Sequence, residues 1–115
     1  MRLIVATNNA GKLAELRDLL PGHIELVTLR DAGLASPDES GETFFDNALL
    51  KAVAAAQAAD GAIADDSGLE VTALDGAPGV HSARFTGSAA SDDDNNRGLL
   101  DALAQVAAGE RGARF

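Results

Sequence analysis

Apolar runs and polar loops alternate along the first part of the chain in a pattern typical of α/β proteins. Residues 2–6, of which Leu3–Ala6 are all apolar, form a run of strand length, which is typical of a strand buried on both faces. The polar loop 7–12 follows directly. Leucines then recur at helical spacing over residues 13–20, and Pro21 ends the expected helix. A second strand is predicted over residues 24–29.

A second helix is predicted after an acidic loop at residues 35–43. Thr43 followed by Asp46 fits the Ser/Thr-x-x-Asp/Glu capping pattern, and the helix should run to about Ala59. Its apolar stripe would consist of Phe45, Leu49, Ala52 and Ala56. The pattern therefore predicts a strand, a helix, a strand and a longer helix in the first half of the chain.

The sequence pattern of the second half of the chain predicts shorter elements. Residues 62–64 indicate a short buried strand, and residues 69–71 continue as either an extended or a helical segment. Ser91 with Asp94 again fits the capping pattern. The apolar face of the helix that follows would consist of Leu99, Leu100, Leu103 and Val106. Residues 111–115 are typical of the beginning of a strand, so we expect the fold to be incomplete.

These elements predict one α/β domain over residues 1–115, with a mixed central sheet flanked by helices. A hydrophobic content of 46% in 115 residues is enough for a packed core. No apolar stretch approaches the roughly 20 residues that a membrane span needs, and no basic-then-apolar leader opens the chain. We therefore expect a soluble, cytoplasmic protein with no membrane partner.

Composition narrows the chemistry. The chain has no cysteine, which excludes disulfides and thiolate metal sites and makes carboxylates the expected metal ligands. A formal net charge of −9 argues against an electrostatic grip on DNA or RNA. An acidic protein still binds a small polyanion when a divalent cation sits between them. Aromatic residues are only 3% of the chain, so a base-stacking platform is not expected.

The polar loop 7–12 is a candidate anion site. It lies between a buried strand and a helix, where free backbone N–H groups and the helix dipole favour an anion. Gly11 would allow the backbone to approach a ligand closely, and Lys12 adds a full positive charge. The loop lacks the Gly-x4-Gly-Lys-Ser/Thr pattern of a P-loop. Phosphate binding and a merely well-capped helix start are both open.

Two adjacent carboxylates at the end of the third strand are a candidate metal site. Asp65 and Asp66 repel each other, so a positive partner should keep at least one of them ionised. A magnesium ion would do so, because it prefers carboxylate oxygens and bridges to substrate phosphates. The side chains that could complete such a site are those of Asp38, Glu39 and Glu42. The alternative is a solvated turn with a helix-capping aspartate.

Two further pairs of side chains are ambiguous. Asn47 and Lys51 are four residues apart on the second helix, so they share a face and could reach one ligand. A pair of this kind is also typical of a solvated helix face. His81 and Arg84 could touch phosphate or could pair with surface carboxylates. The acidic run 92–94 is interpreted as a first-turn dipole effect without a chemical role.

Five segments in series together resemble one known family. They are Thr7-Asn-Asn-x-Gly-Lys12, Gly41-x-Thr-Phe-x-x-Asn-Ala-x-x-Lys-Ala52, Ala64-Asp-Asp-Ser-Gly-Leu69, Leu74-x-Gly-x-Pro-Gly-Val80 with Ser82-Ala-Arg-Phe85, and Arg111-x-Ala-Arg-Phe115. In this order and spacing the chain resembles the inosine/xanthosine triphosphate pyrophosphatase family. The resemblance implies Mg²⁺-dependent hydrolysis of deaminated purine nucleoside triphosphates (ITP, dITP and XTP) to the monophosphate and pyrophosphate.

The resemblance also implies roles for individual residues. Asp66 would bind Mg²⁺ with Glu39 and would accept the proton of the attacking water, as a general base does. Asp38 is the alternative to Glu39, because the match is ambiguous by one position. The residues expected to bind the substrate are Thr7, Asn8, Asn9, Ala10, Gly11, Lys12, Lys51 and Ser67.

The chain departs from the family in one respect. Family members continue after the Arg-x-Ala-Arg-Phe segment with a Phe-Gly-Tyr-Asp-Pro and a Ser-His-Arg motif for base and ribose, and these 115 residues contain neither. We therefore expect the N-terminal part of an inosine triphosphatase-like domain, a homodimer when full length. Two alternatives are a nucleotide-binding fragment without catalysis and a Maf-like nucleotide pyrophosphatase, whose Ser-x-Ser-x-Arg-Arg opening differs from residues 7–12.

Overall fold

The apolar run near the start of the chain forms the central strand of a three-stranded sheet in a computed structural model of residues 1–115. β1 (Arg2–Val5) pairs in parallel with β2 (Glu25–Thr28) on one side and β3 (Gly61–Ile63) on the other. Parallel strands end at the same edge of a sheet, and ligands of α/β proteins bind outside that edge. The segments that leave β1 and β3 there carry most of the predicted site residues.

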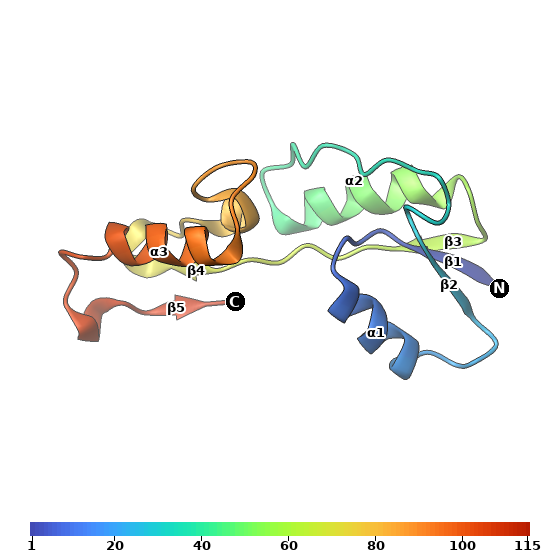
Figure 1. Ribbon diagram of the computed structural model, residues 1–115, viewed down its shortest axis with the longest axis horizontal. Helices are drawn as coiled ribbons and strands as arrows, with labels where there is room; N and C mark the ends of the chain where they lie inside the picture. The colour runs from blue at the N-terminus through green and yellow to red at the C-terminus, as the bar shows by residue number, and fades with distance from the viewer. The chain divides into compact units, whose positions relative to one another are not determined.

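Two helices flank this sheet on opposite sides (Figure 1). α1 (Ala10–Leu19) connects β1 to β2, and α2 (Phe44–Ala56) packs against β1 and β3. The core between α2 and the sheet is built from Ile4, Ala6, Leu29 and Ala55. Its partly buried neighbours include several alanines, so helix and sheet approach closely with little side-chain volume between them.

The start of α1 differs from the prediction. The helix begins at Ala10, so residues 10–12 form its first turn and the loop is limited to residues 7–9. The reason is the side chain of Asn9, which caps the helix by accepting hydrogen bonds from the backbone N–H groups of Gly11 and Lys12.

The buried face of α2 is not its predicted apolar stripe. Phe45 is 72% exposed and Leu49 48% exposed. The buried residues are Asn47, Lys51 and Ala55, which follow one another at four-residue spacing. The helix also ends at Ala56, three residues before the predicted end. The face of α2 that packs inward is not the most hydrophobic one, because Asn47 and Lys51 make polar contacts on the same side as Ala55.

A second compact unit comprises residues 67–115, and the first comprises residues 1–66. The sequence shows no linker between them. That the two units belong to one domain remains a prediction. In the second unit β4 (Glu70–Val71) pairs antiparallel with β5 (Ala113–Arg114), which resolves residues 70 and 71 as extended. The strand expected near residues 111–115 is therefore present. Short 3₁₀ helices cover Thr72–Leu74, Gly79–Arg84 and Ala108–Glu110.

The third predicted helix is α3 (Asp92–Ala102), and its capping box is confirmed. The Ser91 hydroxyl accepts from the Asp94 backbone N–H, and the Asp94 carboxylate accepts from the Ser91 N–H. The helix ends before Leu103, which is buried, so Val106 lies beyond it. None of the helices in the structure has both the length and the apolar character needed to cross a membrane.

Candidate active site

The segment from Thr7 to Lys12 forms an internally satisfied helix start. The Asn9 Oδ1 atom lies 2.9 Å from the Gly11 nitrogen and 3.2 Å from the Lys12 nitrogen. The Thr7 hydroxyl in turn accepts from the Asn9 N–H at 3.1 Å. The structure thus shows the well-capped helix start that the sequence left open. Binding of phosphate by this segment remains a prediction, with Lys12 as its cation.

A cavity beside this segment adds two residues that sequence reasoning missed. It has a volume of about 260 Å³ and is lined by Thr7, Asn8, Asn9, Ala10, Leu13, Thr28 and Arg30. Thr28 is the last residue of β2, and Arg30 follows the strand by two residues. In the sequence only their place after a predicted strand could have indicated them, because the ends of neighbouring parallel strands meet at one edge of the sheet.

The adjacent carboxylates of Asp65 and Asp66 are neutralised by two different lysines. Asp65 forms an ion pair with Lys12 of α1, and both side chains are partly exposed. Asp66 Oδ1 lies 3.1 Å from the Lys51 ammonium, and these two side chains are only 11% and 10% exposed. The positive partner expected from the like-charge repulsion is therefore present twice in the protein itself.

Lys51 connects two carboxylates that are far apart in the sequence. Its ammonium nitrogen lies 3.3 Å from Glu39 Oε1 as well as 3.1 Å from Asp66 Oδ1. Of the two candidates in the acidic loop, Glu39 is thus the one that reaches this cluster, and Asp38 is exposed. We refer to Glu39, Lys51 and Asp66 as the carboxylate–lysine cluster.

The cluster has the donor chemistry of a site for a hard divalent cation. The Asp66 Oδ2 atom is buried and has no hydrogen-bond partner, which leaves an unsatisfied acceptor oxygen inside the cluster. Neither unit contains three or more acidic or histidine side chains arranged around one point. A cation held by Glu39 and Asp66 would complete its coordination with water and substrate oxygens, as Mg²⁺ commonly does.

Asn47 also lies in this part of the unit and is fully buried. Its Oδ1 atom accepts a hydrogen bond from the Gly41 N–H at 2.7 Å. The solvated-face interpretation of Asn47 and Lys51 is therefore wrong, since α2 buries both side chains. Gly41 was part of a motif in the sequence, but its contact with Asn47 could not be read from spacing.

Three predicted or ambiguous residues belong to the second unit. Ser67 is its first residue, and His81 and Arg84 lie on the 3₁₀ helix Gly79–Arg84. The predicted contact of Ser67 with substrate remains a prediction. The neighbouring Ser82 has a structural role: its hydroxyl accepts from the Leu69 N–H at 2.9 Å.

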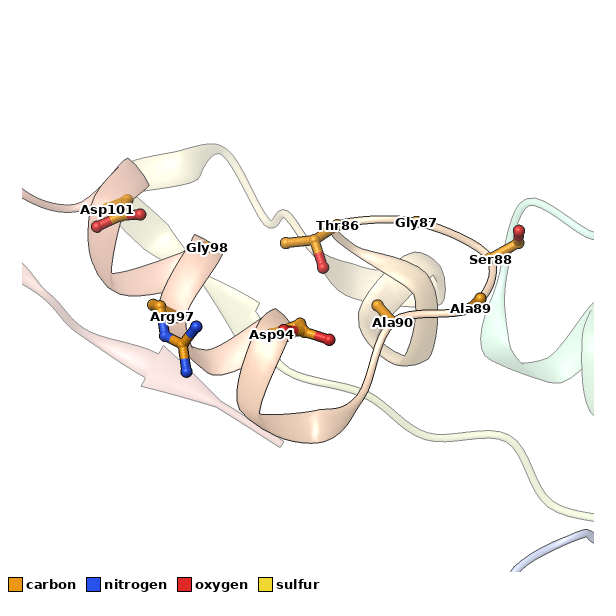
Figure 2. A pocket seen from close by; sticks show the side chains of 9 residues that line it. All are labelled: Thr86, Gly87, Ser88, Ala89, Ala90, Asp94, Arg97, Gly98 and Asp101. Atoms are coloured by element: carbon orange, nitrogen blue, oxygen red, sulfur yellow. The ribbon is translucent and has the colours of Figure 1, made fainter.

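A shallow hollow of about 650 Å³ lies over α3 in the second unit (Figure 2). Gly98 is one of its lining residues, and a Cβ atom at that position would lie 2.2 Å from the Thr86 methyl group. Its polar side chains come from α3 and the loop before it: Thr86, Ser88, Asp94, Arg97 and Asp101. Asp94 is engaged in the capping box, which agrees with its interpretation as a helix-start residue.

Comparison with known proteins shows the family to which the chain belongs. The sequence model of the Ham1 family matches residues 3–115. The chain belongs to the Ham1 family. Similar proteins named dITP/XTP pyrophosphatase occur in Methylococcus capsulatus, 54% identical over 116 residues, and Haemophilus influenzae, 46% identical over 116 residues. The alignments cover 99% of this chain but 58% and 60% of those proteins, so it spans about three fifths of their length.

Solved Ham1 structures agree with the α/β fold class predicted from the sequence. A HAM1 protein from Coxiella burnetii aligns with a TM-score of 0.87 and 36% identity, covering 98% of this chain and 58% of that one. A nucleoside-triphosphatase / dITP/XTP pyrophosphatase from Mycobacterium abscessus aligns with a TM-score of 0.74 and 41% identity, covering 98% and 60%. The predicted family membership is thereby confirmed, and the Maf-like alternative is set aside.

Proposed function

We propose that this chain carries the phosphate- and metal-binding part of a pyrophosphatase for non-standard purine nucleoside triphosphates such as ITP, dITP and XTP. The observation that carries the proposal is the carboxylate–lysine cluster, with its unsatisfied Asp66 oxygen, at the sheet edge where α/β proteins bind ligands. The names of the curated relatives support the same reaction.

In the proposed reaction a water attacks the α-phosphorus, the bond from that phosphorus to the bridging oxygen breaks, and pyrophosphate leaves. Asp66 accepts the proton of the attacking water, as a general base does. Lys51 holds the carboxylates of Glu39 and Asp66 together through its contacts with both. Lys12 supplies positive charge beside the segment expected to hold the triphosphate.

Mg²⁺ is the cation we propose for the site, held by Glu39 and Asp66. When bound, it would neutralise charge on the phosphates and act as a Lewis acid. Ser67, in the second unit, is proposed to contact substrate, and so are the residues from Thr7 to Gly11.

Product analysis tests the proposed function. The 115-residue chain is incubated with ITP and Mg²⁺, and the products are separated by chromatography. We expect inosine monophosphate and pyrophosphate, with no products in EDTA and slow turnover of ATP. Release of inosine diphosphate and inorganic phosphate would contradict the proposed bond cleavage.

Binding of ITP without turnover is the second candidate function. The observation that favours it is coverage, because the chain spans about three fifths of its curated relatives. Saturable ITP binding, measured by calorimetry in a sample that yields no product, would establish it. On the resemblance alone we also propose a cytoplasmic location and, for a full-length protein, a homodimer. Light scattering would test the homodimer by comparing the molar mass of this chain with that of a complete relative.

A further inference from the structure

We propose that Asn47 is a positioning residue for Glu39: it holds the acidic loop so that the Glu39 carboxylate reaches the carboxylate–lysine cluster. The inference rests on the proposed function, because it treats Glu39 as a ligand of the divalent cation. It assigns to Asn47 a role in metal affinity, beyond the stability of α2.

The acidic loop at residues 35–43 has no helix or strand of its own. No helix or strand forms between the end of β2 at Thr28 and the start of α2 at Phe44. The Gly41 N–H of this loop donates a hydrogen bond to the side-chain Oδ1 atom of Asn47 on α2, at 2.7 Å. Gly41 is only two residues from Glu39, so this bond constrains the segment that carries the carboxylate.

Glycine at position 41 permits the close approach of the loop to α2. A Cβ atom there would lie 2.6 Å from Asn47 Oδ1, 2.7 Å from Asp46 Cβ and 3.0 Å from the Asn47 nitrogen. Contacts under 3.0 Å force either the loop or the helix to move. The backbone of Gly41 thus packs directly on the first turns of α2, and Asn47 determines where it rests.

Asn47 is also well placed to act on the cluster as a whole. It is fully buried and precedes Lys51 by one helical turn, so both side chains leave the same face of α2. A buried asparagine is costly unless hydrogen-bonded, yet its Nδ2 atom has no partner. A purely apolar side chain would suit the packing of α2 better. The hydrogen bond that the structure shows for this side chain is the Oδ1 bond that holds the loop.

The test uses Mn²⁺ as the probe, because it takes the same oxygen ligands as Mg²⁺ and is measured by electron paramagnetic resonance without substrate. For Asn47→Ala we expect Mn²⁺ affinity to fall about 10–100-fold, the usual effect of removing a residue that orients a metal ligand. We also expect the Gly41 amide to exchange faster with deuterium. Gly41→Ala should displace the loop through the clash of its new Cβ atom with α2, and it should weaken Mn²⁺ binding similarly.

Two further variants separate positioning from general destabilisation. Asn95→Ala removes a buried asparagine of the second unit that bonds the Thr86 N–H and the Ala83 carbonyl, and it should lower stability without changing Mn²⁺ affinity. Asn47→Asp keeps the acceptor oxygen, so Gly41 should stay protected and Mn²⁺ affinity should not fall.

The inference is overturned if folded Asn47→Ala binds Mn²⁺ as the wild type does. It is equally overturned if Asn47→Asp loses affinity while Gly41 stays protected, or if the wild-type chain shows no saturable Mn²⁺ binding. Failure of the proposed function has a different signature. In that case Mn²⁺ binding depends on Asn47, but ITP is not converted to inosine monophosphate and pyrophosphate.

Discussion

Asp65 and Asp66 are consecutive residues, yet their carboxylates pair with lysines from different helices. Asp65 pairs with Lys12 of α1, and Asp66 pairs with Lys51 of α2. In an extended segment, successive side chains point to opposite sides, and α1 and α2 lie on opposite sides of the sheet (Figure 1). One pair is partly exposed and the other is nearly buried, which gives the two aspartates different chemistry.

The first prediction concerns this difference. Asp66→Asn removes the proton acceptor and a proposed metal ligand, so turnover of ITP should fall by about 10²–10⁴, the usual contribution of a general base. Asp65→Asn is the matched control, because it leaves the Asp66–Lys51 pair intact, and its loss should be much smaller. The measurement is the rate of product formation by each folded variant, followed by chromatography. Equal losses for the two variants would contradict the assignment of Asp66.

The second prediction concerns the charge balance of the cluster. Lys51→Met leaves the Glu39 and Asp66 carboxylates without their shared cation, so the free energy of unfolding should fall by about 3 kcal/mol. Mg²⁺ should restore more stability in this variant than in the wild type, because it takes over the neutralisation of both carboxylates. Urea unfolding with and without Mg²⁺ measures both effects.

Lys12→Met provides the comparison for Lys51→Met. Its ion pair with Asp65 is partly exposed, so the loss should be no more than about 1 kcal/mol. A larger loss from Lys12→Met than from Lys51→Met would contradict the burial argument.

The third prediction concerns Gly98 on α3. A Cβ atom there would lie 2.2 Å from the Thr86 Cγ2 atom, so Gly98→Ala should destabilise the second unit by about 1–3 kcal/mol. In a Thr86→Ser background, which lacks that methyl group, the same change should become neutral or stabilising, because alanine is the better helix former. Thermal unfolding of the four proteins forms a double-mutant cycle. Additive effects would contradict the steric cause.

The fourth prediction concerns pH. Hydrogen bonds from the Ser91 backbone N–H and then its hydroxyl lower the pKa of Asp94 below its usual 3.8. A carboxyl whose folded pKa is lowered stabilises the fold above its unfolded pKa, and this contribution disappears as the pH falls through the folded pKa. The stability difference between wild type and Asp94→Asn should therefore be constant near pH 7 and narrow below about pH 4. Urea titrations across that range measure it, and a difference that widens on acidification would contradict the sign.

Local signals predicted the elements well, because their causes are local. The strand predicted over residues 2–6 is β1 (Arg2–Val5), and Ser91 with Asp94 forms the expected capping box. Thr43 caps α2 through the Asp46 N–H. The start of α1 was misplaced because Asn9 was interpreted as part of a ligand loop, while its side chain serves the helix. Motif order was enough to predict the family.

What the sequence determined by itself was the succession of strands, caps and helices, and the residue types of the candidate site. Only the tertiary structure decided which face of α2 is buried and which lysine meets which aspartate. Sequence periodicity describes one element at a time, and Asn47, Lys51 and Ala55 are selected by partners on other segments. The Glu39–Lys51–Asp66 cluster joins a loop, a helix and the end of a strand, and a contact of that kind exists only once the chain has folded.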